Sequence, residues 1–305
     1  MEIRIATRKS ELALWQANHV AARLDELPQV SKVTLIPLTT RGDEILDISL
    51  QKIGGKGLFI KELEIAIQAG EADIAVHSMK DVPAAMPSGF CIAAVLERAS
   101  PADALVSAPA CNFADLPDGA IIGSSSLRRQ AQLLALRPDV TVKPLRGNVV
   151  TRIGKLDNGN YQAIVLASAG LQRLGLESRI SEEFGPQQML PAAAQGVIGI
   201  ECNDNRGDLC DLLSAIEHAE TKLTTLAERA VALKLGANCQ SPVASYATIA
   251  DGTLSIEALV ASPDGRQLLR EQSTGPSSEA ESIGTLVAER LLELGAGDIL
   301  REAQS

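Results

Sequence analysis

The chain has 305 residues, of which 46% are hydrophobic and 22% charged, a balance typical of a globular protein with two or three domains. Its formal net charge is −10 and only 2% of its residues are aromatic. A nucleic-acid partner is therefore not expected, because such proteins need a basic face and aromatic rings for base stacking. The sequence shows no signal-peptide pattern and no run of membrane-spanning length. We therefore expect a cytoplasmic protein without a membrane partner, and a monomer, since no interface stripe stands out.

The first third of the chain alternates strand and helix patterns. Strands are predicted at 2–7, 32–39, 72–78 and 91–97, and helices at 11–24 and 58–69. Ser10 is suited to cap the first helix, which would place Arg8 and Ser10 beside free helix N–H groups that favour anions. Residues 40–56 are predicted to be a mobile loop. The end of this loop overlaps the run Gly54-Gly55-Lys56-Gly57. This run lacks the Ser or Thr that follows the lysine in a phosphate-binding loop, and it lacks that motif's full spacing.

A second α/β series follows Ser100-Pro101. Strands are predicted at 103–107, 120–123, 140–145 and 163–167 and within 190–202, with helices after 124, after 148 and around Arg173. Such alternation predicts parallel sheets with helices on both faces.

From residue 221 the pattern changes. A helix is expected up to Gly236, then three strands separated by the hairpin signals Asp251-Gly252 and Asp264-Gly265, then a helix over 278–294. The fold class is therefore α/β, with two α/β domains and a small C-terminal α+β domain that contains a three-stranded antiparallel sheet.

Polar residues end one buried strand, in the run His77-Ser78-Met79-Lys80-Asp81-Val82-Pro83. The carboxyl end of a buried strand is the usual place for a site in an open α/β sheet. Lys80 and Asp81 could instead point to opposite faces of an extended segment and make separate surface contacts. Alternatively, Asp81 could act as an acid, a base or a cation stabiliser in a partly desolvated pocket rich in arginine.

Six arginines follow predicted strands or begin the next helix: Arg8, Arg128, Arg129, Arg146, Arg152 and Arg173. Any one of them could be a surface residue paired with an acid. Because the carboxyl ends of parallel strands share one edge, the six together predict a ligand with many anionic groups. Ser124-Ser125-Ser126 lies at the start of the predicted helix that carries Arg128 and Arg129. These serines could either cap that helix or bind an anion at its N-terminus.

The five cysteines are odd in number and form no C-x-x-C pair, and the three histidines lie far apart in the sequence. We therefore expect neither a disulfide framework nor a metal site. Cys91 and Cys202 are interpreted as buried hydrophobic residues, and Cys111 and Cys210 have no feature that suggests chemistry. Cys239 follows a helix in a polar loop and is the better candidate for a covalent role.

The chain resembles the porphobilinogen deaminase (hydroxymethylbilane synthase) family over residues 4 to beyond 242. The stretches that carry the resemblance include Arg4 to Arg8, Leu12 to Gln16, Thr40 to Asp43, Gly54 to Phe59, Asp73 to Pro83, Gly123 to Arg129, Leu145 to Asn148, Ala169 to Gly175 and Asn238 to Gln240.

The resemblance implies an enzyme of three domains, the first two similar to periplasmic binding proteins with an active-site cleft between them. The expected bounds of the three domains are residues 1–97 with 196–216 for the first, 98–195 for the second and 217–305 for the third. The implied transferase joins four porphobilinogen molecules head to tail with loss of ammonia, and hydrolysis frees hydroxymethylbilane for tetrapyrrole (haem) biosynthesis.

The resemblance further implies a dipyrromethane cofactor, held by a thioether to Cys239, and a catalytic Asp81 that contacts pyrrole N–H groups and stabilises the azafulvene cation. Implied cofactor- and substrate-binding residues are Arg8, Ser10, Lys56, Ser78, Lys80, Ser126, Arg128, Arg129, Arg146, Asn148, Arg152, Arg173 and Gln195.

Two other functions compete with this hypothesis. A non-catalytic solute-binding module could use the same two α/β domains, although it would not need Cys239 or a third domain. A pyridoxal-phosphate enzyme could use Lys80 as its Schiff-base lysine, although nothing else in the sequence suggests that cofactor.

Overall fold

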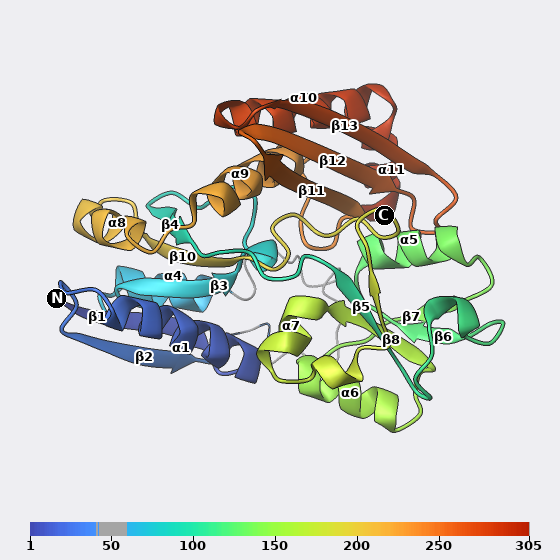
Figure 1. Ribbon diagram of the computed structural model, residues 1–305, viewed down its shortest axis with the longest axis horizontal. Helices are drawn as coiled ribbons and strands as arrows, with labels where there is room; N and C mark the ends of the chain where they lie inside the picture. Colours follow the sequence, from blue (N-terminus) through green and yellow to red (C-terminus); the bar gives the residue numbers. More distant parts are fainter. Residues whose placement is uncertain (41, 43–59, 305) are drawn as a thin grey trace. The chain divides into compact units, whose positions relative to one another are not determined.

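The structure is a computed structural model that describes residues 1–40, 42 and 60–304 (Figure 1). Its contacts group the chain into two units, the first made of Met1–Ala99 with Val197–Lys222 and the second of Ser100–Gly196 with Leu223–Ser305. The Gly54–Gly57 run with Lys56, and nearly all of the predicted loop over 40–56, lie outside the described residues.

The first unit is built on a five-stranded sheet with the order β2-β1-β3-β10-β4. Apolar residues of its central strands pack against the buried side of α1, which presents Ala17, Val20 and Leu24 to them. The elements of this unit are β1 (Glu2–Arg8), α1 (Glu11–Asp25), β2 (Lys32–Leu38), α4 (Lys61–Gln68), β3 (Ile74–Ser78), a 3₁₀ turn η1 (Met79–Asp81), β4 (Phe90–Val95), β10 (Ile198–Asn203) and α8 (Gly207–Ser214).

The second unit contains a sheet of the same design, with the order β7-β6-β8-β5-β9. Two buried clusters cover its two faces, one containing Phe184 and Ile122 and the other Leu145 and Ile164. Its elements are β5 (Asp103–Ser107), η2 (Phe113–Asp115), β6 (Ile121–Gly123), α5 (Leu127–Leu136), β7 (Thr141–Lys143), α6 (Val149–Asp157), β8 (Ala163–Ala167), α7 (Ser168–Arg173), η3 (Glu177–Arg179) and β9 (Glu182–Phe184).

The prediction of parallel sheets is wrong for one strand in the middle of each sheet. In the first sheet β10 runs antiparallel to β3 and β4, and in the second β5 runs antiparallel to β8 and β9. Both strands enter their sheet on a connection from the other unit and not through a helical crossover, so the rule that links alternating elements to parallel strands does not apply to them. Consequently, β5 and β10 begin at the edge where their parallel neighbours end.

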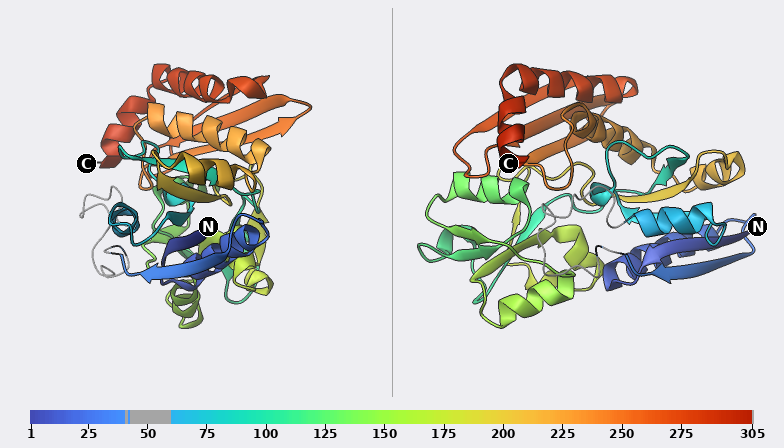
Figure 2. Two further views of the ribbon diagram at one scale, coloured as in Figure 1. Left: turned by 90° about the vertical axis from the view of Figure 1, so that its left-hand side faces the viewer. Right: turned by 180° about the vertical axis from the view of Figure 1, so that it is seen from behind.

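The C-terminal part of the second unit is a three-stranded antiparallel sheet with the order β11-β12-β13. Helices α9, α10 and α11 cover one of its faces with a continuous apolar core, and the views from the side and from behind show α10 lying along the sheet (Figure 2). The elements are α9 (Ala219–Lys234), β11 (Val243–Ala250), β12 (Thr253–Ala261), β13 (Leu268–Pro276), η4 (Ser277–Glu279), α10 (Ala280–Glu293) and α11 (Ala296–Gln304).

The other face of this sheet packs against α5. Ala131 of α5 joins Ala244, Leu259 and Ala261 in one buried cluster, and the hairpin tip at Gly265 touches the α5 backbone. The fold-class prediction of two α/β domains and a C-terminal antiparallel sheet is thus confirmed. Among the described residues no helix is both long and apolar enough to cross a membrane.

The contact between Gly265 and α5 can be tested with a matched pair of variants. Gly252 and Gly265 each follow an aspartate in a hairpin and have φ of 74° and 72°. A Cβ at Gly265 would lie 2.5 Å from the Ala131 carbonyl oxygen, whereas a Cβ at Gly252 meets nothing within 4 Å. Both alanine variants carry the cost of a left-handed backbone, about 1–2 kcal/mol.

We expect Gly265→Ala to lower the thermal unfolding midpoint clearly more than Gly252→Ala, because it adds an overpacking cost of about 1–3 kcal/mol. Circular dichroism melts of both variants measure the difference. Equal shifts would show that the hairpin does not press on α5.

Candidate active site

The polar run after β3 does not continue the strand. β3 ends at Ser78, and Met79–Asp81 form a 3₁₀ turn, so the alternative in which Lys80 and Asp81 extend to opposite faces is wrong. The turn is fixed from beneath, because Met79 is fully buried and its N–H donates to the Val197 carbonyl at 3.0 Å. Lys80 is half-buried and Asp81 is exposed.

The first unit has a small open pocket, of about 70 Å³, at the edge where β1 and β3 end. Four of the predicted site residues line it: Arg8, Ser10, Ser78 and Asp81. Ser10 caps α1, accepting the Ala13 N–H at 3.4 Å, so the N-terminus of that helix lies at the pocket as predicted. The pocket thus combines a guanidinium and a helix N-terminus with one exposed carboxylate.

Two further residues of this pocket, His77 and Gln16, were given no site role in the sequence analysis. His77 is buried and its Nε2 lies 2.8 Å from a carboxylate oxygen of buried Glu201, which faces it from β10. Ser78 exchanges hydrogen bonds with the Gln16 carboxamide instead, at 2.8 and 3.2 Å. The neighbouring His77 and Ser78 therefore have different partners.

In the second unit the predicted arginines gather at one sheet edge. β6, β7 and β8 run parallel, so the segments that follow them begin at the same edge. These segments carry Ser126, Arg128, Arg129, Arg146, Asn148, Arg152 and Arg173. Arg8 ends a strand of the other sheet. We expected all six arginines at one sheet edge. The structure instead places Arg8 at an edge of the first sheet and the other five at an edge of the second.

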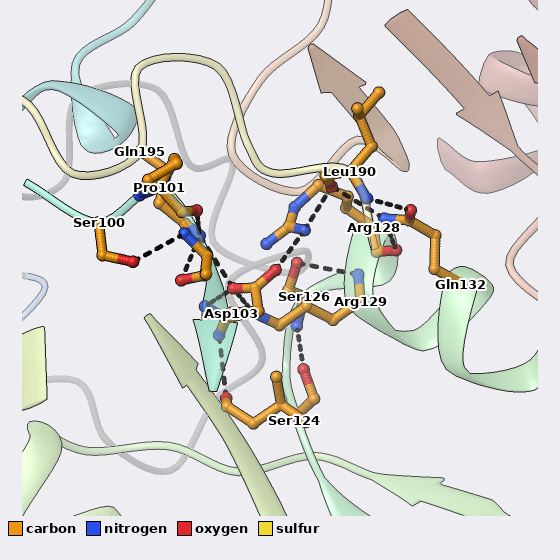
Figure 3. Close-up of polar contacts among 12 residues, drawn as sticks. Ser100, Pro101, Asp103, Ser124, Ser126, Arg128, Arg129, Gln132, Leu190 and Gln195 are labelled. Atoms are coloured by element: carbon orange, nitrogen blue, oxygen red, sulfur yellow. Dashed lines mark hydrogen bonds and ion pairs between the residues drawn. The ribbon is translucent and has the colours of Figure 1, made fainter. Parts of the chain in front are cut away.

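Asp103, which the sequence did not reveal as part of the site, is the buried centre of this edge (Figure 3). One carboxylate oxygen accepts from Arg128 Nη1 at 2.6 Å, and the other accepts from Arg129 Nε and Nη2 at 2.9 and 2.7 Å. The Gln195 carboxamide also donates to Asp103, at 3.0 Å. The reversed direction of β5 explains the contact, because it brings the first residue of that strand to the edge where β6 and β8 end.

The electrostatics of this cluster favour a charged carboxylate. Burial by itself raises the pKa of Asp103, but the attraction of Arg128 and Arg129 outweighs it and holds the pKa below its ordinary value. One anion thus faces two buried cations, which leaves a net positive charge at the edge. Arg128 and Arg129 also donate to the carbonyls of Leu190 and Val165, so both guanidinium groups are held in fixed orientations.

The three serines before α5 each have a structural role. Ser126 caps the helix, accepting the Arg129 N–H at 3.4 Å, and Ser124 accepts the Ser126 N–H at 3.2 Å. Ser125 donates to the Leu145 carbonyl and accepts the Leu145 N–H, at 2.9 and 3.0 Å. The hydroxyl of Ser125 therefore joins the turn before α5 to the turn before α6.

The turn before α6 is similarly braced. Asn148 caps the helix through the Thr151 N–H at 2.8 Å, and Arg152 Nε donates to the Gly147 carbonyl at 2.8 Å. Gly147 has φ of 114° and tight contacts with Thr151, so a side chain there would be strained. Arg146 and Arg152 are half-buried beside this helix N-terminus.

Arg173, at the end of α7, donates to the Gly196 carbonyl at 2.8 Å. Burial lowers its pKa to about 10, which still leaves the guanidinium charged at neutral pH. A carboxylate ligand would favour the charged form and so offset the cost of burial.

Cys239 is exposed in the loop between α9 and β11. The loop is a tight turn, in which Asn238 accepts the N–H groups of Gln240 and Ser241 and donates its own N–H to the Ser241 hydroxyl. Cys239 therefore lies in the same unit as five of the predicted arginines, whereas Asp81 lies in the other.

The described residues of the second unit suit a ligand with several carboxylates, because they combine an excess of cationic side chains with two helix N-termini. The exposed thiol of Cys239 offers a point of covalent attachment for such a ligand. The residues therefore fit an attached group that carries acetate and propionate side chains.

Comparisons with known proteins agree with this site. A family model described as the porphobilinogen deaminase dipyromethane cofactor binding domain matches residues 3–211, and the model of the porphobilinogen deaminase C-terminal domain matches residues 222–293. A porphobilinogen deaminase from Chromobacterium violaceum is 52% identical over 299 residues, covering 98% of this chain and 97% of that protein.

Solved structures with weaker likeness include the VFT2 domain of BvgS from Bordetella pertussis, with a TM-score of 0.44 and 17% identity over 72% of this chain and 90% of that chain. The aliphatic sulphonate binding protein SsuA from Escherichia coli has a TM-score of 0.41 and 13% identity over 76% of this chain and 70% of that chain. These scores are too low to support an argument, so the fold class rests on the strand orders. On the family models and the near-complete match to the Chromobacterium violaceum protein, the chain belongs to the porphobilinogen deaminase family.

Proposed function

We propose that the protein is a hydroxymethylbilane synthase, a cytoplasmic, monomeric transferase that joins four porphobilinogen molecules head to tail. Each joining step releases ammonia, and hydrolysis frees hydroxymethylbilane for tetrapyrrole biosynthesis. The observation that carries the proposal is the group of arginines at one edge of the second sheet, because every pyrrole unit of the growing chain brings two carboxylates.

We further propose that the protein works as three domains, residues 1–97 with 196–216, 98–195 and 217–305. The separate sheets of the N-terminal, central and C-terminal parts support this division.

Cys239 would hold the dipyrromethane cofactor through a thioether. When bound, this group supplies the pyrrole end to which substrate units are joined. Its acetate and propionate groups would bind to Ser126, Arg128, Arg129, Arg146, Asn148, Arg152, Arg173 and Gln195. The preset guanidinium orientations at Asp103 support this role, since they reduce the entropy lost on binding.

In the first unit Asp81 would accept hydrogen bonds from pyrrole N–H groups and balance the positive charge that develops as ammonia leaves. Arg8 and Ser10, which line the same pocket, would bind a substrate carboxylate, with Ser78, Lys80 and Lys56 as further contacts.

The covalent attachment is tested by the intact mass of the purified protein. We expect an excess equal to two linked pyrrole units, lost in Cys239→Ser and retained in the control Cys111→Ser. An unmodified protein that turns over porphobilinogen would contradict the proposed attachment. An unmodified protein without turnover would instead favour the solute-binding or pyridoxal-phosphate alternative.

The role of Asp81 is tested with Asp81→Asn, which keeps the shape of the side chain and removes its charge. We expect kcat to fall about 10²–10³-fold, because charge stabilisation in the transition state is lost, while the intact mass still shows the cofactor. Asp81→Glu, which keeps the charge, should retain more activity. Turnover of Asp81→Asn within a few-fold of the parent enzyme would exclude this role.

The role of Asp103 as a positioning residue is tested with Asp103→Asn. The folded-state pKa is below the ordinary value, so Asp103 stabilises the fold above about pH 4 and the stabilisation is lost as pH falls through the lowered pKa. Removing the charge leaves two buried cations uncompensated, at a cost of about 3–5 kcal/mol.

We therefore expect Asp103→Asn to lower the thermal midpoint at pH 7, to flatten its decline at acid pH, and to raise KM more than it lowers kcat. Asp139→Asn, at an exposed pair with Arg137, is the matched control and should change the midpoint far less. An unaltered acid profile in Asp103→Asn would show that this carboxylate does not hold the arginines.

A further inference from the structure

Three cysteines of the first unit lie together although they are distant in the sequence. The Sγ atoms of Cys91, Cys202 and Cys210 are separated by 3.8, 4.0 and 3.7 Å. Among the described residues, these three side chains form a group of possible metal ligands. Their sulfur atoms lie close enough together to bind one metal ion. The sequence did not predict it, because no two of these cysteines have a ligand spacing along the chain.

The fold brings the three thiols together from three elements. Cys91 of β4 and Cys202 of β10 are directly opposite each other in an antiparallel pair, and Cys210 lies on α8, which packs against the same core. Cys202 is fully buried, whereas Cys91 and Cys210 are half-buried.

The spacing of the sulfur atoms fits tetrahedral coordination. A Zn–S bond of about 2.3 Å and tetrahedral angles place neighbouring sulfurs about 3.8 Å apart. The three distances in the structure, 3.7 to 4.0 Å, lie close to this value. A disulfide would need the sulfurs to approach to about 2.05 Å. The arrangement is that of one triangular face of a zinc–thiolate tetrahedron.

We propose that Cys91, Cys202 and Cys210 form a binding site for a thiophilic divalent cation of the Zn²⁺ and Cd²⁺ class, with a water molecule as the fourth ligand. Binding breaks three S–H bonds and forms three metal–sulfur bonds. Three protons pass to the solvent and no atom changes its oxidation state. Thiolate ligands select these cations over Mg²⁺ or Ca²⁺, which prefer oxygen.

The surroundings of the trio carry charges of both signs. Asp204 is close enough to Cys91 to raise its pKa, although burial has the larger effect, and the guanidinium of Arg206 interacts electrostatically with Cys202. Burial also raises the pKa of Cys202. Three thiolates and a divalent cation carry a net charge of −1, and the nearby Arg206 is itself paired with Asp208 at 2.7 Å.

This site is separate from the pocket at Asp81. Along β10, Ile198 is opposite Ser78 and Cys202 is opposite Ile74, so the trio lies four residues further along the sheet, about 13 Å away. The ion would join β4, β10 and α8, and ligand binding to the native state alone raises stability. The proposal does not depend on the reaction that the protein catalyses.

The test is a titration of the reduced protein with Cd²⁺ in the absence of thiol reagents. We expect one equivalent to bind, with a sulfur-to-cadmium charge-transfer band in the ultraviolet, release of about three protons and a rise in the thermal midpoint. The double variant Cys91→Ser/Cys210→Ser should bind at least tenfold more weakly, and Cys111→Ser should bind like the parent. A missing band in the parent protein, or an equal band in the double variant, would overturn the proposal.

A second measurement on the parent protein avoids any question of whether the variants fold. Alkylation with iodoacetamide, followed by peptide mapping, compares each cysteine with and without Cd²⁺. We expect Cd²⁺ to protect Cys91 and Cys210 and to leave Cys111 unprotected. Protection of Cys111 alone, or of no cysteine, would show that the trio is not the site.

Discussion

The buried carboxylate of Asp103 is the interaction on which the anion-binding edge of the second unit depends. Two guanidinium groups in a protein interior repel each other and lose their hydration, so they need a counterion that is also buried. Asp103 provides it, and its hydrogen bonds to Arg128, Arg129 and Gln195 connect three segments of the chain. Because one carboxylate neutralises only one of the two cations, the same cluster both holds the arginines in place and leaves positive charge for an anionic ligand.

Much of the architecture could be predicted from the sequence. The alternation of apolar runs with turn residues indicated the two α/β series, and Asp251-Gly252 and Asp264-Gly265 marked the hairpins of the C-terminal sheet. Helix N-termini could be predicted for the same reason at Ser10 and at the Ser124–Ser126 run, and Ser10 and Ser126 are N-caps in the structure. These features depend on local chemistry, which is visible in a short stretch of sequence.

Features that depend on strand direction could not be predicted in this way. Asp103 opens an ordinary apolar strand, and only the reversal of that strand brings it to Arg128. The pairs His77 with Glu201 and Cys91 with Cys202 have the same origin, because β10 is also reversed and meets β3 and β4 from a distant part of the chain. Nothing in the residues near position 103 or 201 distinguishes a reversed strand from a parallel one.

The turn at Cys239 has a consequence for how an attached group would be held. Three hydrogen bonds close it, and they join Asn238 to Gln240 and Ser241, the residues that follow the cysteine. Around Asp103 the two guanidinium groups are likewise held in place by protein groups, the carboxylate and the carbonyls of Leu190 and Val165. A group joined to that thiol would therefore meet a loop and an arginine cluster whose geometry is set by hydrogen bonds within the polypeptide.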